Sequence, residues 1–411
     1  MKREPHATVS TEALRGLKYF RRLRPLLERL RDSGSQRDRA GNRSLHFDQY
    51  CALVLLMLFN PTMRSLRGIQ QASQLKKVQK KLGCARTSLG SLSESVAVFE
   101  PERLKGIIAE LAPQLQPVGR DARLKDIRNT LTLVDATLLE ALPRMAEASL
   151  LKARTGSGRI KWRLHTHFEV ERYVPSRIDV THAGGGAGDE RAVLERTIES
   201  DRLYIMDRGY AKFTLFNGIV ATGSSYVCRI RDNSKYDVVQ ERPLSKAAIA
   251  ERVFQDAVVS IGTGSRKKAR PDHSVRLVSI AIKPHRKAGR SSHYNRKGST
   301  GPGSDGVLRL ATNLLDVPAE IIALLYHYRW TIEIFFRFFK QLLGCRHLLS
   351  YSQKGIEIQT YCAIIACMLL SLWTGKKPTR RTYEMICFYF TGLADEDELL
   401  EHIAKLKNQD T

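Results

Sequence analysis

Residues 131–135 read Leu-Thr-Leu-Val-Asp, and a similar run of four largely apolar residues before an aspartate returns at 203–207 as Leu-Tyr-Ile-Met-Asp. Short β-prone runs of this kind predict strands, so Asp135 and Asp207 should each end a strand. Side chains at the carboxyl ends of strands are where sites form in α/β sheets. A single aspartate after a strand is more often a turn residue or a helix cap, so the inference of a site needs the pair.

The sequence around these two runs predicts a mixed α/β domain. Residues 160–170 and 173–180 are strand-like and predict an antiparallel hairpin, 190–199 predicts a helix, and 225–230 predicts a further strand. The glycine-rich run 184–188 lacks the Gly-Lys-Ser/Thr ending of a phosphate-binding loop, so we expect a plain loop and no nucleotide cofactor. Strands among helices place this region in the α/β class.

A third carboxylate lies on a long predicted helix, residues 318–343. At about 100° per residue, Tyr326, Arg329, Glu333 and Lys340 share an arc roughly 60° wide, beside an apolar stripe that would anchor the helix. In an ordinary amphipathic helix Glu and Lys pair four residues apart, whereas Glu333 and Lys340 are seven apart. We therefore expect Arg329 and Lys340 to bind phosphates and Tyr326 to position a group by a hydrogen bond.

Three carboxylates on separate elements suit divalent metal ions. Mg²⁺ and Mn²⁺ take oxygen ligands. Two such ions about 3.5–4 Å apart can activate an attacking oxygen and steady a leaving one. The sequence therefore predicts that Asp135, Asp207 and Glu333 are both the metal ligands and the catalytic residues of an enzyme that acts on phosphodiesters.

The chain carries a formal charge of +25, from 67 Lys and Arg against 42 Asp and Glu. Such a surface attracts polyanions, so nucleic acid is the expected partner; a merely basic soluble protein or a ribosome-associated one is the alternative. The charge gathers in a strand-rich segment at about 231–305 that looks inserted: residues 266–297 hold eleven Lys or Arg and one acid. Charge runs are usually solvated, but we favour phosphate contact here. The phosphate-binding residues predicted outside the long helix are Arg208, Arg266, Lys267, Lys268, Arg286 and Lys287.

Both ends of the chain are predicted to be helical. Residues 11–30 predict a basic amphipathic helix. Two of the helices that follow, 75–82 and 87–99, are joined through Gly83 and have the outline of a helix-turn-helix. DNA readout by residues 86–93 and a plain helical bundle are equally open there. The other helices expected are 46–59 and 65–73 near the N-terminus and 357–373, 379–391 and 395–406 near the C-terminus.

The cysteines indicate a reducing compartment. There are seven, an odd number without a CxxC pair, and most lie in apolar runs, which is typical of buried thiols in a cytosolic protein. Cys345 and His347 could form half of a zinc site, but the second ligand pair is missing, so no structural zinc is expected. The apolar stretches 51–59 and 361–373 fall short of the roughly 20 residues that span a bilayer, and no secretory signal is expected.

The four polar residues of the long helix match the signature Y-(2)-R-(3)-E-(6)-K of the insertion-sequence transposases of the IS-four family, which the chain resembles over roughly 131–351. Val134-Asp-Ala-Thr137 and Met206-Asp-Arg-Gly-Tyr210 look like the two Asp-bearing strand motifs of that family. Each motif alone is weakly specific, whereas the set in this order is specific. The resemblance implies a DDE-type transposase of a prokaryote, cytoplasmic and associated with the nucleoid.

The resemblance also implies an architecture. It predicts a ribonuclease H-like core at 126–345 that holds the β-rich insertion, a helical DNA-binding region at 1–125, and a helical region at 346–411 as a candidate for dimerisation. Relatives can stack a flipped base of a hairpin intermediate on a tryptophan of the insertion. The tryptophans of this chain are at 162, 330 and 373. Tyr294 or Tyr226 would have to substitute, or the hairpin route differs.

The function implied is cut-and-paste transposition: strand nicking at terminal inverted repeats and strand transfer to target DNA, with two Mg²⁺ or Mn²⁺ ions, by a homodimer in a paired-end complex. Two other functions stay open, a nuclease or resolvase on the same core and a non-catalytic DNA-binding protein or regulator derived from a transposase. Intact acids at all three positions argue against the last, because a surface that only binds DNA gains nothing from carboxylates beside phosphates.

Overall fold

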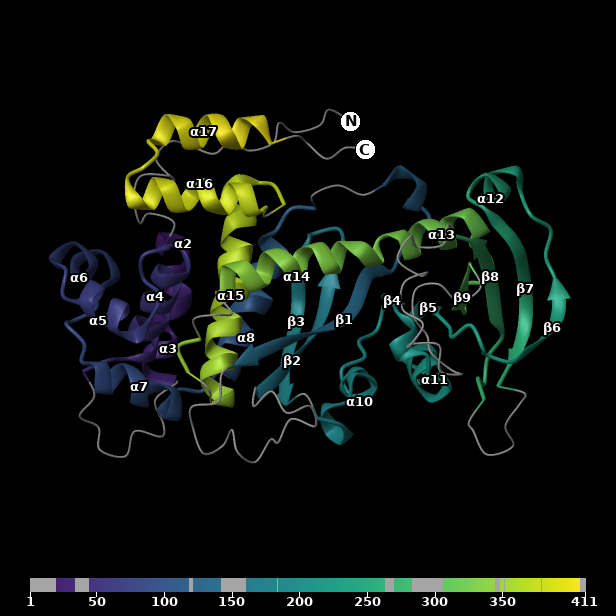
Figure 1. The fold of residues 1–411 in the computed structure, drawn as a ribbon, viewed down its shortest axis with the longest axis horizontal. Helices are drawn as coiled ribbons and strands as arrows, with labels where there is room; N and C mark the ends of the chain where they lie inside the picture. Colours follow the sequence, from purple (N-terminus) through teal and green to yellow (C-terminus); the bar gives the residue numbers. More distant parts are fainter. Residues whose placement is uncertain are drawn as a thin grey trace, which may run out of the picture.

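The computed structural model describes residues 20–33, 44–117, 121–141, 160–182, 184–262, 270–282, 306–343, 348–350, 352–377 and 379–406. Helices from the N-terminal part lie at one side of the molecule, and a large sheet extends from the middle to the other side (Figure 1). Within the described residues, nine strands pair in one sheet in the order β3-β2-β1-β4-β5-β9-β8-β7-β6. The chain therefore has a mixed α/β fold built on a large sheet, as predicted.

The strands are β1 (Thr130–Ala141), β2 (Ile160–Glu169), β3 (Val174–His182), β4 (Arg202–Met206), β5 (Ser225–Arg229), β6 (Tyr236–Glu241), β7 (Val253–Ile261), β8 (Val275–Ala281) and β9 (Val307–Thr312). The central strands β1, β4 and β5 run parallel, and the predicted hairpin of β2 and β3 is antiparallel beside β1. Leu203, Tyr204, Ile205 and Met206 of β4 are all fully buried, because parallel strands in the centre of a sheet are covered on both faces.

The inserted segment continues this sheet instead of forming one of its own. β8 pairs with β9, and β9 pairs with β5, so β6, β7 and β8 extend the sheet beyond its parallel centre. β8 coincides with the predicted strand-like run 274–282, whereas β9 was not predicted, because its six residues are interrupted by Arg309. The connecting helices are η4 (Gly186–Gly188), α10 (Glu190–Glu195), η5 (Arg208–Tyr210), α11 (Phe213–Ala221) and α12 (Lys246–Ala250).

The N-terminal part is helical. Its elements are α2 (Phe20–Glu28), α3 (Leu30–Ser33), α4 (Phe47–Leu58), α5 (Leu66–Ser73), α6 (Lys76–Leu82), α7 (Leu89–Val98), α8 (Glu102–Leu111), η2 (Ala112–Gln114) and η3 (Ala122–Leu124). α4 to α7 fall within the predicted ranges, α8 was not predicted, and the predicted helix 11–30 lies partly outside the described residues. All twelve residues of α4 are buried.

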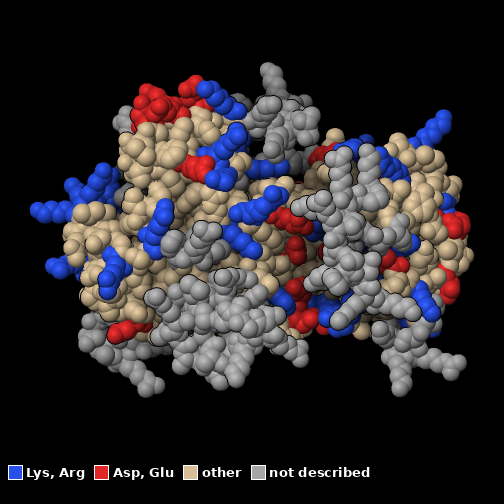
Figure 2. Space-filling view, viewed as in Figure 1, with Lys and Arg blue, Asp and Glu red and all other residues tan. Residues whose placement is uncertain are grey.

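The connection between α6 and α7 does not have the form of a helix-turn-helix. Six residues, 83–88, separate these helices, where that motif has a turn of three or four. α7 instead packs against α4, α5 and α15 (Gln353–Thr374). The plain bundle is therefore the better interpretation of α7. Basic side chains stand out from the end of the molecule formed by α5 and α6 (Figure 2).

The long helix predicted over 318–343 is two helices. Tyr328 separates α13 (Ala319–His327) from α14 (Arg329–Leu343). The backbone tightens there, because Thr331 N–H bonds to the carbonyl oxygen of Tyr328, three residues back, at 2.8 Å. The two helices keep nearly the same direction across the sheet (Figure 1). The prediction of one unbroken helix is wrong, but residues of both helices still face the same part of the sheet.

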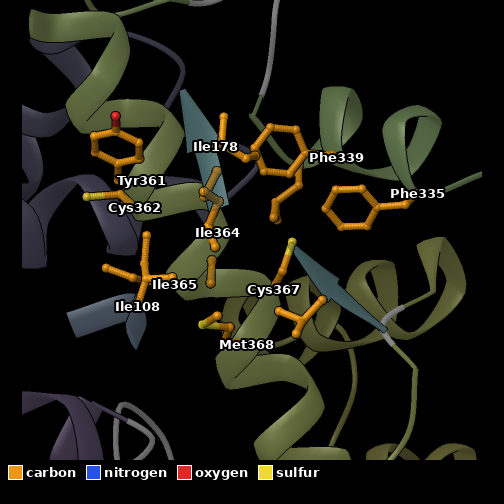
Figure 3. Close-up of a cluster of buried hydrophobic side chains, with 14 of the residues drawn as sticks. Ile108, Ile178, Phe335, Phe339, Tyr361, Cys362, Ile364, Ile365, Cys367 and Met368 are labelled. Atoms are coloured by element: carbon orange, nitrogen blue, oxygen red, sulfur yellow. The ribbon is translucent and has the colours of Figure 1, made fainter. Parts of the chain in front are cut away.

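α15 is the central helix of the molecule. Figure 3 shows its side chains between Ile108 of α8 on one side and Ile178 of β3 and Phe339 of α14 on the other. Among the described helices it alone is long and apolar enough to cross a membrane, and 89% of that apolar window is buried inside the molecule. It therefore behaves as a core helix. The helices α16 (Arg380–Thr391) and α17 (Glu396–Lys405) follow as an antiparallel pair.

The six cysteines in the described part of the chain are free and buried, as the sequence predicted. The predicted absence of zinc at Cys345 and His347 concerns residues outside the described ranges.

Candidate active site

The sheet places Asp135 and Asp207 side by side. The parallel register of β1 and β4 runs to the pair Val134 and Met206, so the next residue on each strand is one of the two aspartates. Neighbouring strands lie about 4.8 Å apart. Asp207 directly follows β4 as predicted, but β1 continues to Ala141 because its pairing with β2 continues. The prediction that Asp135 ends its strand is wrong: only the parallel pairing ends there.

The helices α13 and α14 bring three further side chains to these aspartates. Tyr326 donates its hydroxyl hydrogen to Asp207 Oδ1 at 3.3 Å. Arg329 Nη2 donates to Glu333 Oε1 at 2.6 Å, and Arg329 Nη1 lies 3.9 Å from Asp135 Oδ2. Arg329 thus bridges an aspartate of the sheet and a glutamate of the helix. Five of the residues predicted for the site meet in this cluster.

Two other predicted residues lie on the same segments as the cluster, one on α14 and one directly after Asp207. Lys340 is partly exposed two turns beyond Glu333 on α14 and makes no ion pair within the described residues. Arg208 follows Asp207, and its buried Nη1 has no hydrogen-bond partner in the described part of the chain. A buried charged donor is costly when nothing accepts its hydrogen bond. Neither cation forms an ion pair within the described residues.

The electrostatics of the site centre on Asp135. Burial raises the pKa of its carboxyl to about 6, against the opposing effects of the Ala136 N–H and Arg329, and the negative charges of Asp207 and Glu190 add to the rise. Acidic side chains gather along the middle of this face of the molecule, with Lys and Arg around them (Figure 2). Arg329 supplies the positive charge inside the cluster.

The sequence reasoning missed Glu190, Arg163 and Tyr210. Glu190 opens α10, its Oε1 lies 3.4 Å from Arg163 Nε, and burial raises the pKa of its carboxyl. The hydroxyl of Tyr210 is buried without a hydrogen-bond partner among the described residues. Burial raises the pKa of that hydroxyl, and the charges of Asp135 and Glu190 add to the effect. The sequence feature that could have pointed to Glu190 is the acidic pair at 189–190, which follows the glycine-rich run 184–188.

Not all basic side chains of the inserted segment lie at the surface of the molecule. Arg276, one of the eleven basic residues counted between 266 and 297, is 1% exposed. It donates two hydrogen bonds to Asp256, both at 2.7 Å, and further bonds to carbonyl oxygens of the β9–α13 connection. Arg276 therefore stabilises the core, and its buried guanidinium cannot bind a phosphate. The predicted residues Arg266, Lys267, Lys268, Arg286 and Lys287 lie outside the described residues.

Tyr226, one of the two tyrosines considered in place of the base-stacking tryptophan of relatives, is also buried. Tyr226 is 0% exposed, stacks on Phe216 with ring centroids 4.3 Å apart, and has its hydroxyl 3.1 Å from His273 Nε2. Its ring is therefore not accessible to a nucleobase, and that expectation is wrong. Tyr294 lies outside the described residues.

The carboxylates suit a divalent ion by their chemistry, since all the donors are oxygens of the kind that Mg²⁺ and Mn²⁺ bind. Within the described residues, however, no three Asp, Glu, His or Cys side chains are gathered closely enough to hold a metal ion. Asp135 and Asp207 are neighbours, whereas Glu333 is turned to Arg329. The donor chemistry thus suits the ion, with Asp135 and Asp207 as the adjacent pair and Glu333 held by Arg329.

Comparison with known proteins places the chain in a family. Residues 128–369 match the model of the transposase DDE domain. The chain is 28% identical over 218 residues to "Putative transposase y4zB" of Sinorhizobium fredii (strain NBRC 101917 / NGR234), covering 53% of this chain and 54% of that protein. It is 26% identical over 254 residues to "Probable transposase for insertion sequence element IS5377" of Geobacillus stearothermophilus, covering 58% and 60%.

The chain thus spans little more than half the length of these curated relatives. A solved structure of the piggyBac transposase synaptic complex with hairpin DNA matches with 10% identity and a TM-score of 0.41, over 100% of this chain and 88% of that one. The domain model covers more than half of the 411 residues, and the chain therefore belongs to the transposase DDE domain family.

Proposed function

We propose that this chain is a DNA transposase that cleaves and joins phosphodiesters with Asp135, Asp207 and Glu333 as its catalytic residues, in cut-and-paste transposition. The observation that carries the proposal is the meeting of three separate elements at one point. β1 and β4 present adjacent aspartates, and α14 presents Glu333 through the Arg329 bridge. A binding surface alone would not hold carboxylates where phosphates must approach.

Asp135 and Asp207 would hold Mg²⁺ or Mn²⁺, and Glu333 would complete the ligand set. Two such ions would activate the attacking oxygen and stabilise the leaving one. Tyr326 keeps Asp207 oriented through its 3.3 Å hydrogen bond. Arg329 neutralises the acids in the resting state, and on release from Glu333 its planar guanidinium suits a phosphate of the bound strand. Arg208 and Lys340 supply further charge to that strand.

The N-terminal helices offer a second contact surface for duplex DNA. From residue 49 to residue 93 the sequence has seven basic residues and no acid. All seven are exposed, and none makes an ion pair within the described residues. Four are lysines on α6, a helix with a single buried residue, Val78. Phosphate neutralisation by such a surface is the main source of affinity for DNA. These residues are Arg64, Arg67, Lys76, Lys77, Lys80, Lys81 and Arg86.

The remaining architecture is proposed from the sequence resemblance: a ribonuclease H-like core at 126–345 with its insertion, a DNA-binding region at 1–125, and a region at 346–411 that mediates a homodimer on paired ends. The protein would act in the cytoplasm on terminal inverted repeats and target DNA. The mixed sheet with its parallel centre supports the core assignment.

The decisive test is cleavage of a labelled duplex that carries the DNA ends flanking the coding sequence, with Mg²⁺. Asp135→Asn, Asp207→Asn and Glu333→Gln should each abolish cleavage and spare binding. Asp237→Asn, an exposed carboxylate on β6, should cleave as wild type does. Wild-type cleavage by any of the first three would overturn the assignment.

The same assay separates the alternative functions. Cut ends that are never joined to a target duplex would indicate a nuclease or resolvase. Binding without metal-dependent cleavage would indicate a regulator that kept the residues. Ion binding has its own readout: Mg²⁺ should raise the melting temperature of the wild type, because a ligand of the folded state stabilises it, and should raise that of Asp207→Asn less.

A further inference from the structure

Arg329 connects two of the three proposed catalytic acids. Its Nη2 lies 2.6 Å from Glu333 Oε1 on the next turn of α14, and its Nη1 lies 3.9 Å from Asp135 Oδ2 on β1. The side chain of Arg329 is 12% exposed, against 33% for Glu333 and 25% for Asp135. The guanidinium therefore lies between the two acids, and one oxygen of Glu333 is already engaged.

The position of Arg329 on α14 makes this ion pair costly to open. Arg329 is the first residue of the helix, and the first turn contains no acid. A helix N-terminus carries partial positive charge and so disfavours a cation. Arg329 is also largely buried, and a buried charge that loses its partner destabilises a protein strongly. We therefore expect Glu333 to leave Arg329 only when another anion takes its place.

The backbone of α14 need not move for such an exchange. Phe335 and Phe339 are fully buried and anchor the helix in the core (Figure 3). A change of partner at Glu333 therefore requires only rotation of side chains. A phosphate is a suitable replacement at Arg329, because two of its oxygens can accept parallel hydrogen bonds from one planar guanidinium.

We propose that the Arg329–Glu333 ion pair is a latch on the metal site, which withholds Glu333 until a phosphate of the bound DNA strand takes Arg329. This inference rests on the proposed function. After the exchange the phosphate pairs with Arg329, and the carboxylate of Glu333 is free to serve as an oxygen ligand. DNA and the divalent ion should then bind cooperatively, and linkage requires each to strengthen the binding of the other by the same factor.

The first test measures Mn²⁺ binding to the full chain without DNA, by electron paramagnetic resonance of the free ion. Arg329→Gln removes the cation that competes for Glu333. This variant should bind Mn²⁺ more tightly than the wild type, by roughly the 5- to 150-fold of an ordinary coupling between sites. Glu333→Gln should bind Mn²⁺ nearly as the wild type does, because the latch already withholds that carboxylate in the wild type.

Two further variants separate the latch from a general effect of charge. Arg337→Gln removes an exposed cation one turn beyond Glu333, which makes no ion pair in the described part of the chain, and should leave Mn²⁺ binding unchanged. In the double variant Arg329→Gln, Glu333→Gln the gain in Mn²⁺ affinity should largely disappear. A gain of equal size with and without Glu333 overturns the latch.

The second test adds a duplex that ends where the flanking DNA would be cut, so that binding is measured without cleavage. Fluorescence anisotropy reports DNA binding, and the Mn²⁺ bound by the duplex alone is subtracted. The duplex should tighten Mn²⁺ binding to the wild type by a factor similar to that of Arg329→Gln. It should tighten Mn²⁺ binding much less in Arg329→Gln, where the latch is already open.

The outcomes separate the two proposals. Binding of both DNA and Mn²⁺ without coupling, with unchanged Mn²⁺ affinity in Arg329→Gln, overturns the latch and leaves the proposed function standing. An absence of DNA binding at low salt, or of Mn²⁺ binding with and without DNA, overturns the proposed function and the latch together. Tighter Mn²⁺ binding in Arg329→Gln that depends on Glu333 supports the latch.

Discussion

Replacing Asp135 with asparagine should make the folded protein more stable, although the change removes a proposed metal ligand. Burial raises the pKa of the Asp135 carboxyl from 3.8 to about 6. One pKa unit corresponds to about 1.36 kcal/mol, so the ionised carboxylate lowers the free energy of unfolding by about 3 kcal/mol at pH 8. Asparagine has the same shape without the charge. Its amide oxygen can keep the 2.8 Å hydrogen bond from Ala136 N–H.

The direction of the shift fixes the pH dependence. A carboxyl whose pKa is raised by folding binds its proton more tightly in the folded state, so the wild type gains stability as the pH falls from above 6 toward 4. Asparagine does not titrate. The advantage of Asp135→Asn should therefore be about 3 kcal/mol at pH 8 and less than about 1 kcal/mol at pH 4.

Urea unfolding followed by circular dichroism measures both values. Asp237→Asn, the exposed control on β6, should change stability by less than about 0.5 kcal/mol. The reasoning is refuted if Asp135→Asn is no more stable than the wild type at pH 8, or if its advantage is the same at both pH values. The predicted result would also show that loss of cleavage in this variant is not loss of the fold.

Further changes test other buried contacts of the fold, the first four by the same unfolding assay. Gly262→Ala should cost about 1–3 kcal/mol, because Gly262 has a φ of +83° and a Cβ there would lie 2.7 Å from an aromatic ring. Arg276→Met should cost about 3–5 kcal/mol by leaving Asp256 buried without its main partner, and Asp256→Leu in the same chain should recover much of the loss. Tyr210→Phe should be neutral or stabilising, since its hydroxyl has no described partner. Tyr204→Phe should instead cost about 1 kcal/mol, because it removes the acceptor of a 2.8 Å bond. A thiol reagent should label at most one of the seven cysteines before unfolding, since six are buried; rapid labelling of two or more would contradict the structure.

The sequence predicted the two aspartate-bearing strands because their apolar runs are short, β-prone and bounded by polar residues. It could not predict that β1 continues to Ala141. Residues 136–141 read Ala-Thr-Leu-Leu-Glu-Ala, which mostly favour helix, and pairing with β2 overrides that preference. The break at Tyr328 has no proline or glycine to announce it. Local sequence patterns therefore predicted that these strands and helices exist. Their end points depend on tertiary contacts, which the local sequence does not indicate.

The parts of the site that the sequence missed depend on packing between distant segments. Glu190 influences Asp135 because α10 packs against η5, the turn that follows β4, and the acidic pair at 189–190 does not by itself indicate that contact. The misassigned Arg276 shows the reverse case. It stands among basic residues in the sequence, yet pairing of β7 with β8 brings Asp256 to it and buries both. Charge counted along a chain does not distinguish a surface from a buried ion pair.

The central helix α15 has a consequence for how the chain is made. The wholly buried α4 packs against α15, and Tyr383 of α16 donates a hydrogen bond to the carbonyl oxygen of Leu58, 325 residues earlier in the chain. During synthesis the N-terminal helices therefore stay without these partners until α15 and α16 have also left the ribosome. Contacts so distant in sequence form slowly, and apolar surface stays exposed meanwhile. A fragment that stops before α15 should aggregate, however intact its own helices are.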